Sequence, residues 1–202
     1  MDNINWKFTK KYGKHWIKIK FHKNEPELKE GKRIEGIRFC EAIKKSVEYP
    51  LLIDKGSISC KGAQYVLGWD SQAQEEILSN CKEKTSVGTK KLRSILSDQI
   101  IFEEPFEYIG LNMEGTPDLL VSFCSPEEVH NLIKTYNGVK GASLNTSFSG
   151  MLSICGGIVA NTFLKNEISL SFGCDDSRKY ARMGRDTLVV GIPNRLFEVF
   201  VK

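Results

Sequence analysis

Four of the six cysteines occur in two pairs with almost the same spacing. Cys40 precedes Cys60 by 20 residues, and Cys155 precedes Cys174 by 19 residues, with an apolar segment inside each pair. Thiolates bind soft metals and act as nucleophiles, and four of them together suit an iron–sulfur cluster or a structural zinc ion. Because the sequence contains no Cys-x-x-Cys pair, such a site would have to be assembled from separated segments.

The repeated spacing predicts two related half-units, over residues 34–137 and 149–202. In each half an apolar helix carries the first cysteine, and a second helix begins at the second cysteine after a strand. An internal pseudo-twofold duplication of this kind would bring the four thiols together at its centre. The alternative is a chance alignment of cysteines that fill a core, since cysteine is among the most often buried residue types.

Apolar periodicity, turn residues and helix-start signals predict the elements that would position these thiols. The predicted helices cover residues 39–48, 71–82, 89–97, 125–136, 152–164 and 193–199, with short helices at Cys60 and Cys174. The predicted strands cover residues 16–22, 51–53, 99–102, 106–109, 119–123, 142–148, 168–172 and 188–190. We therefore expect an α+β fold in which a mixed sheet has flanking helices.

Size and composition predict one compact domain over residues 1–202. The chain is 41% hydrophobic and 27% charged, as ordinary globular domains are. It contains no apolar run of transmembrane length, and its first residues lack the apolar core of a secretory signal. We therefore expect a cytoplasmic location, where cysteines stay reduced, and no membrane partner.

The first part of the chain is basic, with ten Lys or Arg against four Asp or Glu in residues 1–33. A basic segment can contact nucleic acid, but residues 16–22 alternate as a strand with Lys18 and Lys20 on one face. We interpret residues 1–33 as a basic strand and loop. Nucleic-acid-binding motifs and glycine-rich nucleotide loops are absent, so neither ligand is expected. The sequence does not indicate an oligomeric state.

Several sequence blocks follow one another in an order typical of one protein family. They are Arg38-Phe-Cys40-Glu-Ala-Ile43, Ser59-Cys60-Lys-Gly62-Ala63, Pro117-Asp118-Leu-Leu-Val121, Cys155, Ser171-Phe-Gly-Cys174 with Arg178, and Val190-Gly-Ile-Pro193. With these blocks, from Trp16 onward, the chain resembles the DUF169 family, an uncharacterised group of archaea and anaerobic bacteria. The resemblance implies a shared fold and shared cysteine positions, and it names no reaction.

The resemblance also selects among the cysteines. The family's cysteine positions correspond to Cys40, Cys60, Cys155 and Cys174. Cys81 and Cys124 fall outside that pattern, and we interpret them as core or surface thiols. The chain departs from the family at Gly156–Gly157, where the family carries an acid, and at Asp176, where the family carries glycine.

We expect a cytoplasmic protein that binds a [4Fe–4S] cluster through these four cysteines, with Arg178 beside the cluster, and that binds or reduces a small molecule. The anaerobic distribution of the family favours the cluster, and zinc or no metal is the alternative. A second hypothesis is a metal-free thiol-dependent enzyme, but a nucleophilic cysteine needs a base, and the three histidines lie outside the matching blocks. A third is a small-molecule-binding or accessory protein without catalysis. The sequence leaves open whether the protein is an enzyme.

Overall fold

The computed structural model describes residues 4–12, 15–27, 31–84, 87–148 and 150–201, apart from the side chains of residues 4–6 and 83–84. The strands are β1 (Ile17–His22), β2 (Lys32–Arg33), β3 (Leu51–Asp54), β4 (Tyr108–Leu111), β5 (Leu119–Cys124), β6 (Ser169–Ser171) and β7 (Leu188–Pro193). The α-helices are α1 (Ile4–Tyr12), α2 (Phe39–Lys45), α3 (Lys61–Val66), α4 (Gln74–Lys84), α5 (Thr89–Ser97), α6 (Pro126–Lys140), α7 (Asn161–Lys165), α8 (Asp175–Tyr180) and α9 (Phe197–Val201). Two 3₁₀ turns, η1 (Ser71–Ala73) and η3 (Asn194–Leu196), and one π-helix, η2 (Ser153–Ala160), complete the described elements.

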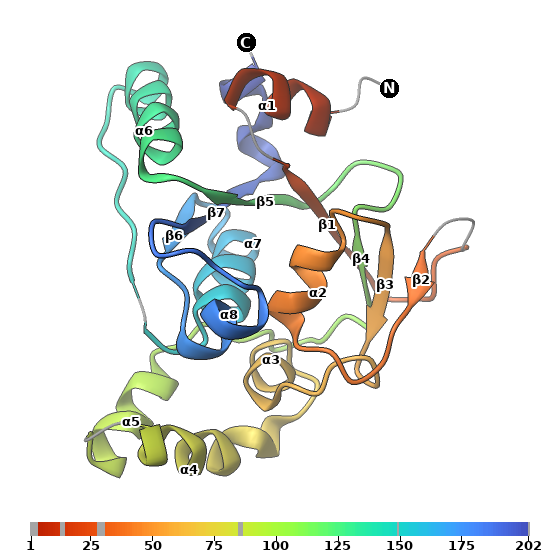
Figure 1. The fold of residues 1–202 in the computed structure, drawn as a ribbon, viewed down its shortest axis with the longest axis vertical. Coiled ribbons are helices and arrows are strands. Elements are labelled where there is room, and N and C mark those ends of the chain that lie inside the picture. The colour runs from red at the N-terminus through yellow and green to blue at the C-terminus, as the bar shows by residue number, and fades with distance from the viewer. Residues whose placement is uncertain (1–3, 13–14, 28–30, 85–86, 149, 202) are drawn as a thin grey trace.

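The strands form a mixed sheet in the order β2-β3-β4-β1-β5-β7-β6. Adjacent strands of the sheet run antiparallel, except β2 and β3, which run parallel. In Figure 1, α2, α3, α7 and α8 lie on one side of the sheet, α1 and α6 lie on the other side, above β5, and α4 and α5 lie at the bottom of the view. The predicted α+β class, with a mixed sheet and flanking helices, is confirmed. None of the described helices is both long and apolar enough to cross a membrane.

Alternation along β5 shows how the sheet divides the core. Leu119, Val121 and Phe123 belong to the core shared with α2, α3 and η2. Leu120 and Cys124 belong to a second core, formed with α1, α6 and α9. Successive side chains of a strand point to opposite faces, so β5 is buried on both sides, as its continuous apolar run predicted.

The N-terminal segment contains a helix that the interpretation of residues 1–33 as strand and loop did not include. In α1, Phe8 and Tyr12 are four residues apart and therefore share one helix face. The Phe8 ring lies 5.0 Å from the Trp16 ring and 5.9 Å from the Phe200 ring, measured between centroids. The Tyr12 hydroxyl donates to the carbonyl oxygen of Phe200 at 3.1 Å. The helix is thus stabilised by the C-terminal helix, a partner that local sequence does not reveal.

Other predicted elements also differ from the structure. Two predicted strands have no neighbouring strand to pair with, and one predicted helix ends at a different residue. Residues 99–102 and 142–148 are irregular rather than strands. The backbone N–H of Phe102 donates instead to the carbonyl of Val66 at 2.8 Å. Helix α6 continues beyond residue 136 to Lys140 and ends at Gly141, which has the left-handed conformation that favours glycine.

The close contact between the sheet and the η2–α7 segment depends on Gly191 of β7. A Cβ atom at this position would lie 2.3 Å from Oγ1 of Thr162 and 3.0 Å from Cγ2 of Ile158. Both neighbours are fully buried and β-branched, so they have few alternative rotamers. We expect Gly191→Ala to lower the free energy of unfolding by about 1–3 kcal/mol, measured by urea denaturation.

Gly138 offers a matched control for this substitution. A Cβ atom there meets nothing within 4 Å, and the residue lies inside α6. Gly138→Ala should therefore raise stability by about 0.5–1 kcal/mol through helix propensity. A Gly191→Ala protein as stable as the wild type would show that the η2–α7 segment does not depend on this close approach.

Candidate functional site

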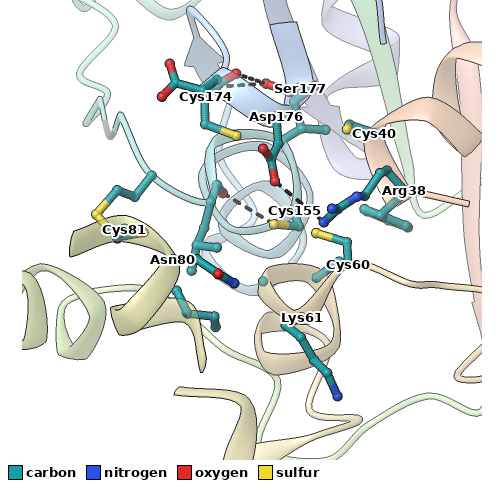
Figure 2. A pocket seen from close by; sticks show the side chains of 18 of the residues that line it. Arg38, Cys40, Cys60, Lys61, Asn80, Cys81, Cys155, Cys174, Asp176 and Ser177 are labelled. Atoms are coloured by element: carbon teal, nitrogen blue, oxygen red, sulfur yellow. Dashed lines mark hydrogen bonds and ion pairs between the residues drawn. The ribbon is translucent and has the colours of Figure 1, made fainter. Parts of the chain in front are cut away.

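A cavity of about 220 Å³ opens beside the helices that cover the sheet. Cys40, Cys60, Cys155 and Cys174 all line it, although they come from four different elements. Figure 2 shows their sulfur atoms turned toward the same space. The fold therefore places the four cysteines selected from the sequence on the wall of one cavity.

Cys40 and Cys60 are brought together by a short parallel contact between the segments that precede their helices. The backbone N–H of Ile37 donates to the carbonyl of Ser57 at 3.2 Å, and the N–H of Ser59 donates to the carbonyl of Ile37 at 3.0 Å. These bonds align the start of α2 with the start of α3. Cys60 is the N-cap residue of α3, and Cys40 is the second residue of α2.

Cys155 lies in the π-helix η2. The backbone N–H groups of Gly156 and Gly157 both donate to the carbonyl of Leu152, at 2.7 and 3.1 Å, and this sharing widens the helical turn. The Cys155 thiol donates weakly to the same carbonyl at 3.6 Å. Sequence periodicity predicted a helix here but not its π form, which is rare and frequently occurs at functional sites.

Gly62 allows α3 to approach η2 closely, so that Cys60 and Cys155 share one wall of the cavity. A Cβ atom at Gly62 would lie 2.4 Å from Cδ2 of Leu152. A Cβ atom at Gly156 would lie at the ordinary contact distance of 3.5 Å from Cγ2 of Val66, so the approach of α3 does not require glycine there.

Cys174 is held by the turn between β6 and α8. Gly173 has a φ of +81°, a backbone conformation in which most other residues are strained. The hydroxyl of Ser177 accepts the Cys174 backbone N–H at 2.7 Å and donates to the Cys174 carbonyl at 2.9 Å. The backbone of Cys174 is therefore fixed on both sides before any ligand binds.

Arg178, which we expected beside the cofactor, is not among the described residues that line the cavity. Its guanidinium donates to the backbone carbonyls of Phe172, Gly184 and Arg185 at 2.7, 2.9 and 3.2 Å. Arg178 thus braces the loops on either side of α8, and its link to Cys174 is indirect. The basic side chains on the cavity wall are those of Arg38 and Lys61 instead.

Comparison with known proteins places this geometry in a family. The model of the DUF169 family, described as "Uncharacterised ArCR", matches residues 13–202. The chain belongs to the DUF169 family. An uncharacterised protein of Methanocaldococcus jannaschii is 27% identical over 197 residues, which cover 89% of this chain and 82% of that protein. No solved structure matches the chain.

The thiols of this DUF169 protein affect one another's ionisation. Burial raises the pKa of the Cys40 thiol to about 12, and the nearby thiolate charges of Cys174 and Cys60 act in the same direction. Burial also raises the pKa of Cys155, again with help from the charges of the other three sulfurs. The four groups are therefore close enough to interact, and Cys40 and Cys155 are neutral thiols at pH 7 in the absence of a cation.

Helix α4 supplies a wall of the cavity that sequence analysis did not assign to the site. Ile77, Asn80 and Cys81 line it, and their spacing of three and four residues puts them on one helix face. Cys81, which we interpret as a core or surface thiol, is partly buried and also packs against the hydrophobic cluster of α4 and α5. Cys124, interpreted in the same way, is buried in the core on the other side of the sheet.

The described residues contain no group of three or more His, Cys, Asp or Glu arranged to hold a single metal ion. The four thiols are instead distributed around the cavity wall. His15, His22 and His130 are all described, and none of them lines the cavity. A thiol here therefore has no adjacent imidazole to act as its base.

Proposed function

We propose that this DUF169 protein binds an iron–sulfur cluster of the [4Fe–4S] type through Cys40, Cys60, Cys155 and Cys174. The observation that carries the proposal is that these four cysteines, from four separate elements, line one cavity. Iron in such clusters is held by cysteine thiolates, so the donor set fits the group. The cytoplasm is the proposed compartment, since no disulfide joins any of the six cysteines, all of which are described.

The distribution of the thiols favours a cluster over zinc. A zinc ion needs all four sulfurs about 2.3 Å from one point, and the described residues contain no such single-ion group. In a cluster each iron takes its own thiolate, so the ligands stand around a larger body. The cavity of about 220 Å³ between the thiols provides the space for that body.

The bound cluster would supply one-electron transfer, or an iron that binds a small molecule. The chain itself supplies the thiolates and an enclosure. Ile77, Leu152 and Ile154 line the cavity and limit the access of water, which is one of the factors that set a cluster's potential. A metal-free thiol enzyme is the alternative, and the absence of histidine from the described lining disfavours it.

The order of elements supports the proposed internal duplication. Apart from β2, η1, α4 and α5, the chain passes first through β1, α2, β3, α3 and β4. Apart from α6 and α7, it then passes through β5, η2, β6, α8 and β7. In each series the first strand neighbours the third, and the third neighbours the second. Each series carries one cysteine in its first helix and one at the N-cap of its second. This order favours half-units that begin at β1 and β5, rather than at residues 34 and 149.

The cluster is tested by strictly anaerobic purification followed by iron, zinc and acid-labile sulfide analysis and a visible spectrum. We expect about four iron and four sulfide per chain with broad brown absorbance, lost in Cys60→Ser and Cys174→Ser. One zinc ion per chain without sulfide would contradict the cluster and support a zinc site instead. A well-folded, colourless and metal-free protein would contradict any metal role.

A further inference from the structure

Arg38 is close to Cys40 in the sequence, but its side chain lies beside the sulfur of Cys60. It is the N-cap residue of α2, and its guanidinium lies between the Asp176 carboxylate and the Cys60 sulfur (Figure 2). Its Nη1 atom is 3.5 Å from Oδ2 of Asp176, and its guanidinium carbon is 4.9 Å from the centroid of the Tyr180 ring. Two residues of α8 therefore hold the guanidinium in place, with its side chain only 30% exposed.

The guanidinium of Arg38 points toward the sulfur of Cys60. The Cys60 sulfur lies within hydrogen-bonding reach of the Arg38 guanidinium, on the side opposite the Asp176 carboxylate (Figure 2). A guanidinium also presents several donors in a fixed plane. Arg38 therefore remains charged beside a sulfur that is one of the proposed ligands.

The other basic residue of the described cavity wall, Lys61, is directed elsewhere. Its Nζ atom lies 3.1 Å from the Asp70 carboxylate and 4.0 Å from that of Glu76. In Figure 2 its side chain points away from the sulfurs. The two cations thus lie on the same wall, and Arg38 is the one turned toward a thiol.

We propose that Arg38 sets the reduction potential of the cluster by donating to the Cys60 sulfur. This inference rests on the proposed function. A cluster that takes up one electron from a low-potential reductant gains one negative charge. A cation and a hydrogen bond at a ligand sulfur stabilise that reduced form more than the oxidised form, and hydrogen bonds to the sulfurs and net charge are known controls of the potential.

The test compares Arg38→Met with Lys61→Met. Each substitution removes one positive charge from the cavity wall, but only the first removes the guanidinium beside Cys60. The measurement is an anaerobic redox titration with dithionite, followed by visible absorbance. At the midpoint potential of the wild type, we expect the ratio of reduced to oxidised cluster in Arg38→Met to be lower on the order of tenfold. Lys61→Met should change this ratio less than about threefold, because the Lys61 side chain points away from the sulfurs. Arg38→Lys keeps the charge but not the planar donors, so it should fall between Arg38→Met and the wild type.

Iron and sulfide analysis of the same samples separates this inference from the proposed function. Equal cluster content in all variants, with a negative shift specific to Arg38→Met, supports the role of Arg38. An unchanged midpoint in Arg38→Met, or an equal shift in Lys61→Met, overturns that role and leaves the cluster in place. A wild-type protein without iron and sulfide overturns the cluster, and the inference about Arg38 with it.

Discussion

Replacing Cys155 by Ala should lower the bound iron and sulfide at least about tenfold, because one of the four proposed ligands is lost. Cys155 is only 8% exposed and lies in the π-helix whose turn directs it into the cavity. No other described side chain of η2 offers a thiolate in its place. The measurement is iron and acid-labile sulfide per chain after anaerobic purification.

Cys124→Ala is the matched control for this experiment. Cys124 is 3% exposed, so its substitution also removes a buried thiol, but on the opposite side of the sheet. It should leave the cluster content unchanged, with the same circular dichroism spectrum as Cys155→Ala. Equal losses in both variants would indicate general destabilisation, and full retention in Cys155→Ala would exclude Cys155 as a ligand.

The stability of the metal-free protein should depend on pH through its buried thiols. Burial first, and then the neighbouring thiolate charges of Cys174 and Cys60, raise the pKa of Cys40 to about 12. The unfolded chain ionises its cysteines near pH 9.0, whereas folded Cys40 stays protonated to about pH 12. The folded state therefore binds more protons in this window, and the free energy of unfolding of the metal-free protein should fall as pH rises from 9 toward 12. Cys40→Ala should reduce this slope, measured by urea denaturation across the same pH range. A free energy of unfolding that does not fall between pH 9 and 12 would contradict the buried, neutral state of the Cys40 thiol.

Elements with local signals were predicted correctly. Ser125 and Pro126 indicated the start of α6. There the backbone N–H of Glu128 donates to the Ser125 hydroxyl at 3.3 Å, and the backbone N–H of Ser125 donates to the Glu128 carboxylate at 2.6 Å. Gly68 ends the short helix that follows Cys60, with a φ of +72°. Caps and strand alternation act within a few residues, so the printed sequence is sufficient to find them.

Elements that depend on distant partners were missed or misplaced. Helix α1 needs the C-terminal helix, which lies more than 180 residues away along the chain. Residues 142–148 had strand-like composition but found no neighbouring strand. The π form of η2 depends on Leu152, whose carbonyl accepts two backbone N–H groups, and such sharing leaves no trace in hydrophobic periodicity.

By itself, the sequence determined the α+β class, the resemblance to the family and the four cysteines that share its pattern. Only the tertiary structure decided that these thiols line one cavity, that Cys81 lines it too, and that Arg38 rather than Arg178 lies beside a sulfur. The physical reason is that convergence depends on contacts between segments far apart in the chain. The bonds of Ile37 align two helices, the absence of a side chain at Gly62 lets a third approach, and α8 then holds the guanidinium in place.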